Sequence, residues 1–193
     1  MLKVLTLIVG QMQTNCYLVY DEKFKEAIII DPGDAADYIE RVISDKELNP
    51  TIILATHGHY DHILAAQELA LAYKIPFLIN KDDLFLVERM VKSARHFGYK
   101  TPLVTPKISG YLKNGQQIPL KSFNLAVLAT PGHTPGSSSF YIKKGNIAFV
   151  GDLFFADGGV GRTDFSYANT IKLNASIAKL KKLPKNSIFY SGH

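Results

Sequence analysis

The chain is 193 residues long, with 47% hydrophobic and 20% charged residues and a formal net charge of +5 at pH 7. A chain of this size and composition can bury a substantial core, which excludes a disordered or fibrous protein, and no apolar run approaches the roughly 20 residues that span a bilayer. The positive charge is modest and the lysines are spread along the chain, so we expect neither a membrane nor a nucleic acid as a partner.

Strands and helices are predicted to alternate through the first half of the chain. Apolar, β-branched runs predict strands at 3–9, 16–20, 26–30, 51–55 and 77–79. The sequence Asp31-Pro32-Gly33 predicts a turn after the third of these strands. Helical patterns follow at 34–48, 62–74 and 80–97. We expect Asp34 and Asp37 to cap the first helix and Asn80 to cap the third.

The second half begins with strands predicted at 123–129, 138–142 and 146–150, and Lys143-Lys144-Gly145-Asn146 predicts a hairpin turn between the last two. A helix at 169–182 and a strand at 187–190 complete the chain. No linker or low-complexity segment interrupts it, so we expect a single domain over 1–193. Two β-sheets packed face to face with helices outside, an α+β sandwich, is the simplest architecture for this order of elements.

The cellular compartment is indicated by the cysteine content and the N-terminus. A single cysteine, Cys16, excludes an internal disulfide and fits a reducing compartment. The first nine residues carry one basic side chain and no small-residue cleavage site, which favours a strand over a signal peptide. We therefore expect a cytoplasmic protein.

The segment 56–62 is the main indication of chemistry. It places His57, His59, Asp61 and His62 between a predicted buried strand and a predicted helix. Side chains alternate in an extended loop, so His57 and His59 are expected to point to the same side. Asp61 and His62 are expected to begin the helix and to turn towards a second ion. Imidazoles suit Zn, Fe or Mn, and a carboxylate completes such a site.

Three further candidate ligands each follow a glycine after an apolar run: His133, Asp152 and His193. Loops at strand ends are how a rigid scaffold brings distant side chains to one point. Of the six histidines, only His96 lies outside such positions. This shared placement predicts one metal centre built from both halves of the chain.

Over essentially its whole length, the sequence resembles the metallo-β-lactamase superfamily, and within it the glyoxalase II (hydroxyacylglutathione hydrolase) branch and its short single-domain relatives. The motifs that carry the resemblance are Asn15-Cys16-Tyr17, Ile30-Asp31-Pro32-Gly33, Thr56-His57-Gly58-His59-Tyr60-Asp61-His62, Thr130-Pro131-Gly132-His133-Thr134-Pro135-Gly136-Ser137, Gly151-Asp152 and Ser191-Gly192-His193. The resemblance implies an αββα sandwich with two divalent metal ions in a cleft at one sheet edge. Zinc is the first choice, with iron or manganese as alternatives.

The resemblance also implies a role for each ligand. His57, His59 and His133 would hold the first metal, while Asp61, His62 and His193 would hold the second. Asp152 would bridge the two. Hydroxide activated between the metals would then attack the acyl carbon of a small-molecule thioester, and Asp61 would orient that nucleophile or take its proton. The alternative is a persulfide dioxygenase with one iron held by His57, His133 and Asp152.

A glycine-rich segment at 158–165 follows the aspartate loop. It lacks the Gly-Lys-Ser/Thr of a phosphate-binding loop. The segment resembles the glyoxalase II loop in which a basic residue binds the glutathione carboxylate, which implies that Arg162 binds substrate. In the alternative interpretation, Arg162 pairs with Asp164 and holds the loop.

The chain ends at His193, where the family usually continues Gly-His-Gly-Pro. We expect this to leave the backbone of His193 unsupported, with weak or absent metal binding at the second site. The sequence leaves the oligomeric state open.

Overall fold

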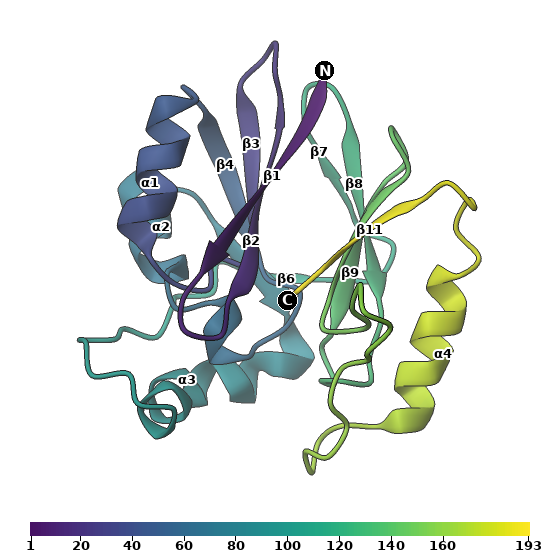
Figure 1. Ribbon diagram of the computed structural model, residues 1–193. Coiled ribbons are helices and arrows are strands. Elements are labelled where there is room, and N and C mark those ends of the chain that lie inside the picture. Colours follow the sequence, from purple (N-terminus) through teal and green to yellow (C-terminus); the bar gives the residue numbers. More distant parts are fainter.

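Two mixed β-sheets face each other in the computed structural model, which describes residues 1–193 (Figure 1). The first sheet has the order β1 (Leu2–Val9), β2 (Thr14–Asp21), β3 (Glu26–Ile30), β4 (Asn49–Leu54), β5 (Phe77–Asn80) and β6 (Gly110–Leu112). The second sheet has the order β11 (Ile188–Ser191), β10 (Ile147–Gly151), β9 (Ser138–Ile142), β8 (Asn124–Ala129) and β7 (Gln117–Pro119). The helices are α1 (Ala36–Asp45), α2 (Ala66–Tyr73), α3 (Leu84–His96) and α4 (Thr170–Leu180).

Alternating side chains of the strands divide the core into layers. In β2, Tyr17 and Val19 belong to the apolar cluster between the sheets, together with Phe140 and Phe149 of the second sheet. Leu18, between them in sequence, belongs instead to the cluster that packs against the helices of the first sheet. This period-two pattern buries both faces of the strand.

Helices cover the two outer faces. The helices α1, α2 and α3 lie against the first sheet and α4 lies against the second (Figure 1). The α+β sandwich predicted from the sequence is therefore confirmed, with the layers in the order helix, sheet, sheet, helix. None of the helices combines the length and the apolar character that crossing a membrane requires.

Several local predictions were wrong. The first helix begins at Ala36, and the residue before it, Ala35, has left-handed backbone angles. No side chain caps this helix, because the Asp34 carboxylate instead accepts hydrogen bonds from the Ala35 N–H and the Tyr99 hydroxyl. The helix predicted at 62–74 is divided into the 3₁₀ turn η1 (Tyr60–His62) and α2. Asn80 does cap a turn, although that turn is the separate 3₁₀ segment η2 (Lys81–Asp83) before α3. The three-residue strands β6 and β7 are too short to give a recognisable pattern.

Strand direction determines where the site forms. The strands β3 and β4 are parallel, and so are β10 and β11. The strand β9 is antiparallel to both β8 and β10, so β8 also runs in the direction of β10 and β11. The carboxyl ends of β8, β10 and β11 thus share one edge of the second sheet, and the loops that follow them meet the loop after β4.

Candidate metal centre

All seven predicted ligands converge at this shared edge. Their donor atoms form two groups, within each of which the atoms lie within 4.8 Å of one another; the groups are His57, His59, His133 and Asp152, and Asp61, His62 and His193. The loop after β4 and η1 provide four of these residues, and the ends of β8, β10 and β11 provide one each. The structure therefore unites residues more than 130 positions apart in sequence.

In the first group, three imidazole nitrogens and one carboxylate oxygen lie close together. The Nδ1 atom of His59 lies 3.0 Å from Nε2 of His57 and 3.0 Å from Nε2 of His133. Oδ2 of Asp152 lies 3.6 Å from Nε2 of His133 and 4.0 Å from Nε2 of His57. Four ligands placed tetrahedrally around an ion at about 2.0–2.1 Å are separated by about 3.3 Å, so these spacings suit one ion.

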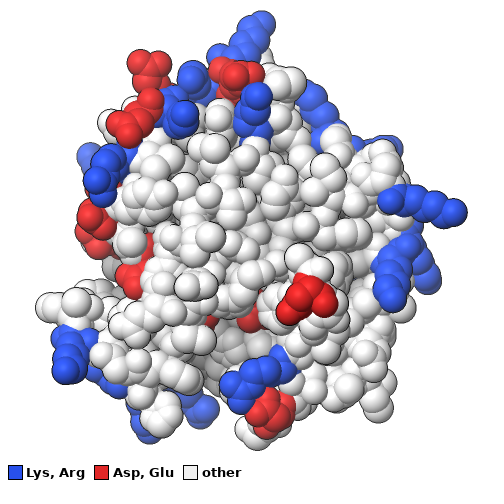
Figure 2. All heavy atoms as spheres, viewed as in Figure 1, with Lys and Arg blue, Asp and Glu red and all other residues white.

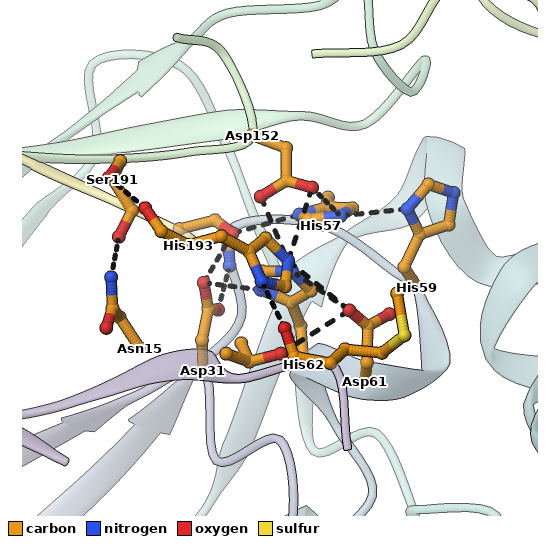
Figure 3. A network of polar contacts seen from close by, with 12 residues as sticks. Asn15, Asp31, His57, His59, Asp61, His62, Asp152, Ser191 and His193 are labelled. Atoms are coloured by element: carbon orange, nitrogen blue, oxygen red, sulfur yellow. Dashed lines mark hydrogen bonds and ion pairs between the residues drawn. The ribbon is translucent and has the colours of Figure 1, made fainter. Parts of the chain in front are cut away.

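In the second group, the carboxylates of two aspartates lie close to two imidazoles (Figure 3). Oδ2 of Asp61 lies 3.7 Å from Nε2 of His62 and 3.4 Å from Nε2 of His193. Asp152 also faces this group, with Oδ1 3.5 Å from Nε2 of His62 and Oδ2 3.7 Å from Nε2 of His193. Asp152 thus directs its carboxylate to both groups, as expected of a bridging ligand.

Each histidine has an acceptor on its outer nitrogen. The Nδ1 atoms lie 3.0 Å from Thr56 Oγ1 for His57, 3.0 Å from Asp31 Oδ2 for His62, 2.9 Å from the Arg162 carbonyl for His133 and 2.9 Å from the Met12 carbonyl for His193. His59 is reversed, with Nε2 2.9 Å from the Tyr167 hydroxyl. A hydrogen bond donated outward fixes the tautomer and leaves the inner nitrogen with a free lone pair.

The buried polar atoms left without partners fit bound metal. His62 Nε2 and Asp152 Oδ1 are buried and have no hydrogen-bond partner. A buried polar atom without a partner is costly unless an ion or water satisfies it. Together with the mixed imidazole and carboxylate donors, these atoms identify a site for divalent metal ions.

Charge is distributed unevenly between the groups. Burial, followed by the neighbouring imidazoles of His62 and His59, holds the pKa of His57 well below its usual value, and burial together with His133 lowers the pKa of His59 to about 3. These imidazoles therefore stay neutral, which is the form that binds metal. Burial also disfavours the charged form of His62, but Asp152, Asp61 and Asp31 outweigh it and raise the pKa of His62 to about 10. The second group attracts a positive charge.

Asp31 holds residues of the metal centre in place through hydrogen bonds, although its sequence context predicted only a turn. It is fully buried, and it accepts hydrogen bonds from the Thr56 N–H at 2.7 Å, the Thr56 hydroxyl at 2.6 Å and His62 Nδ1 at 3.0 Å. It therefore orients His62 directly and His57 through Thr56. Its position after an apolar strand was a signal that could have identified it.

Asp83 was also missed, because its sequence context indicated only the start of a helix. Its buried carboxylate accepts hydrogen bonds from the Gly58 N–H at 2.9 Å, the Gly136 N–H at 2.7 Å and the Thr134 hydroxyl at 2.7 Å. Gly58 separates two predicted ligands, and Thr134 follows a third. One carboxylate thus joins the two loops of the first group across the two sheets.

A cavity of about 350 Å³ opens beside the predicted ligands and is lined by His59, Asp61, His133, Asp152 and His193. Arg162 also lines it, and its guanidinium bonds to both oxygens of Asp164, with Nε 2.9 Å from Oδ1 and Nη2 2.6 Å from Oδ2. The alternative interpretation of Arg162, a pair that holds the loop, is therefore present in the structure. The substrate-binding role of Arg162 stays a prediction.

The expectation that His193 would have an unsupported backbone was wrong, because the Ser191 hydroxyl donates to the His193 carbonyl at 2.5 Å and the two preceding residues are held by neighbouring strands. The Gly192 N–H donates to the Gly151 carbonyl at 2.8 Å, and the Gly192 carbonyl accepts from the Asn15 N–H at 2.7 Å. The Tyr17 hydroxyl and the Asn15 side chain both donate to the Ser191 carbonyl (the Asn15 contact is drawn in Figure 3). The segment that carries His193 is thus held by β2 and β10, while its metal affinity stays a prediction.

Comparison with known proteins gives concordant matches. The model of the metallo-beta-lactamase superfamily matches residues 9–193. Hydroxyacylglutathione hydrolase GloC from Haemophilus influenzae is 37% identical over 194 residues, which cover 96% of this chain and 87% of that protein. The crystal structure of BLEG-1 B3 metallo-beta-lactamase has a TM-score of 0.90 at 33% identity, covering 99% of this chain and 91% of that one. TTHA1623 in a di-iron-bound form has a TM-score of 0.86 at 35% identity, covering 98% and 91%.

Proposed function

Because the chain belongs to the metallo-β-lactamase superfamily and is a metallohydrolase of that family, we propose that it hydrolyses acyl thioesters of the hydroxyacylglutathione type. The observation that carries this proposal is the pair of donor groups joined by Asp152 beside an open cavity. The similarity to hydroxyacylglutathione hydrolase GloC supports the thioester over other carbonyl substrates.

We assign the first ion to His57, His59, His133 and Asp152, and the second to Asp61, His62, His193 and Asp152. Zinc is our first choice, with iron or manganese as alternatives. When bound, such ions lower the pKa of a coordinated water towards neutrality and polarise the carbonyl that is attacked. The buried, unpaired Cys16 fits a cytoplasmic setting for this activity.

Asp61 is the group that we expect to handle the proton of the attacking water. It lines the cavity, and its Oδ2 lies within 3.4 Å of both Thr14 Oγ1 and His193 Nε2. Burial disfavours its charge, but His62 and the hydrogen bond from His193 hold its pKa below the usual range. Asp61 is therefore ionised at neutral pH, so it can orient the water by accepting a hydrogen bond from it.

The remaining residues fix geometry and do not react. Tyr167, the Arg162 carbonyl and Asp31 hold three imidazoles by their outer nitrogens. Such outer hydrogen bonds keep the inner nitrogens aimed at one point, so little reorganisation is required when the substrate binds.

The test is metal content measured together with hydrolysis of S-lactoylglutathione. We expect about two metal ions per chain and thioester turnover, with kcat reduced about 100-fold or more in Asp61→Asn. Asp82→Asn, on the exposed surface of η2, is the matched control and should retain both metal and activity. One iron per chain, no hydrolysis, and oxygen uptake with glutathione persulfide would instead establish the dioxygenase alternative.

A further inference from the structure

An aromatic wall, formed by Phe155, Phe165 and Tyr167, lines the cavity next to the metal centre. The rings of Phe165 and Tyr167 are stacked, with centroids 5.2 Å apart and planes 11° from parallel. Both residues come from the loop after β10, and neither is fully buried. Partly exposed, preordered rings of this kind present an apolar surface to a ligand.

The wall lies beside the histidines of both predicted donor groups. The Phe165 centroid is 5.3 Å from that of His59 and 6.0 Å from that of His133. The third ring of the wall, Phe155, lies near the second donor group, with its centroid 6.2 Å from that of His193. A thioester whose carbonyl lies between the two donor groups therefore brings its substituent into contact with these rings.

The cavity offers little net positive charge. Arg162 is the only lysine or arginine among its lining residues, and Asp164 occupies its guanidinium with two hydrogen bonds. The same guanidinium lies over the ring of Phe165, 4.7 Å from its centroid, so it covers part of the wall. Figure 2 shows most Lys and Arg side chains towards the margin of this face, while Asp or Glu side chains lie at the hollow near its centre.

This charge pattern is a poor match for glutathione, which carries two carboxylates. Recognition of carboxylates ordinarily uses cations or donors that are free to bind them. Leu86 and the exposed side chains of Met12 and Phe97 add apolar surface to the lining. Burial of an apolar group in the cavity therefore contributes more to substrate binding than pairing with an anionic group.

We propose that this cavity selects thioesters with an aromatic acyl group, which packs against Phe165 and Tyr167, and that it does not require the glutathione carboxylates. The inference rests on the proposed thioester hydrolysis and specifies its substrate class. Phe165 and Tyr167 are the specificity-determining residues, and the Arg162–Asp164 pair leaves no free cation for a substrate carboxylate because its charges cancel.

Binding to the metal-loaded full chain tests the cavity without catalysis. The probes are two thioethers that cannot be hydrolysed, S-(2-phenylethyl)-N-acetylcysteamine and S-ethyl-N-acetylcysteamine, with binding measured by calorimetry. We expect the phenyl compound to bind about 10-fold more tightly, and Phe165→Ala to remove most of that difference. Phe24→Ala, an exposed phenylalanine outside the cavity lining, is the matched control and should leave both affinities unchanged.

Hydrolysis tests the same preference in turnover. We expect a lower KM for the phenylacetyl thioester of N-acetylcysteamine than for its acetyl thioester, and a KM for the phenylacetyl compound about 10-fold higher in Phe165→Ala. Asp164→Asn frees the Arg162 guanidinium and should lower the KM of S-lactoylglutathione.

The two proposals fail in different ways. Equal affinity for the two thioethers in the unaltered protein, with S-lactoylglutathione turned over, would overturn the aromatic preference and leave the proposed function intact. If no thioester is hydrolysed but the phenyl thioether binds tightly and Phe165→Ala weakens it, the proposed function is wrong while the aromatic preference of the cavity stands.

Discussion

Asp83 is the residue whose replacement gives the most informative stability prediction. Its carboxylate holds the loop that contains Gly58 against the loop that contains Thr134 and Gly136, and it is fully buried. A Cβ at Gly136 would collide with this carboxylate, so the close approach of the two loops also depends on that glycine. We therefore expect changes at Asp83 to loosen the first metal group without direct contact with a ligand.

The magnitude follows from counting donors. In Asp83→Ala the Thr134 hydroxyl can turn to Ser137 Oγ at 2.7 Å, but the N–H groups of Gly58 and Gly136 lose their acceptors. A buried donor without a partner costs about 1–3 kcal/mol, so two cost about 4 kcal/mol. Asp83→Asn keeps one carbonyl oxygen and leaves one of the two donors facing an amide group, so we expect about 2 kcal/mol.

The assay is urea unfolding of the metal-loaded protein, followed by metal titration against a chelator. The expected order of stability is unaltered protein, Asp83→Asn, then Asp83→Ala, with metal affinity falling about 10-fold or more in both variants. Asp82→Asn, the exposed neighbour, should match the unaltered protein. If Asp83→Asn and Asp82→Asn are equally stable and bind metal equally well, the buried carboxylate does not hold the two loops together.

Three further predictions concern the centre. Tyr167→Phe removes the partner of His59 Nε2 and should weaken metal binding about 10-fold in chelator competition, whereas Tyr111→Phe, on an exposed strand, should have no effect. Gly33→Ala would drive its methyl group into the Asp61 carbonyl, so circular dichroism melting should show a protein destabilised by more than about 2 kcal/mol; unchanged melting would refute the steric argument. Burial and neighbouring imidazoles lower the pKa of His59 in the folded protein to about 3 from 6.5. Between these two pH values the unfolded chain binds more protons than the folded one. The metal-free protein should therefore lose about 2 kcal/mol of unfolding free energy from this group between pH 7 and pH 5. Urea midpoints that stay constant over this range would contradict that linkage.

The order of elements and the identity of the candidate ligands could be predicted from local patterns. Apolar, β-branched runs predicted most strands correctly, because these strands are buried on both faces. In the segment 56–62, the spacing of the donor residues predicted that His57 and His59 point to one side and that Asp61 and His62 follow in a turn. Asp34 misled the prediction of a helix cap because its partner, Tyr99, comes from a loop 65 residues away.

The supporting residues could not be predicted in the same way. Asp31 acts on a histidine 31 positions away, and Tyr167 acts on one 108 positions away. Hydrogen-bonding residues of this type occur throughout any chain, so their local sequence does not indicate a partner.

By itself, the sequence determined the class of fold, the chemical type of each donor and its position at the end of a strand, because hydrophobic periodicity and short motifs are local properties. Only the tertiary structure decided that Asp152 faces both donor groups, that the Arg162 guanidinium is occupied by Asp164, and that Phe165 and Tyr167 form the cavity wall. These outcomes depend on how closely the edges of two sheets approach each other. That distance is set by the packing of the whole core, which no single segment of the chain specifies.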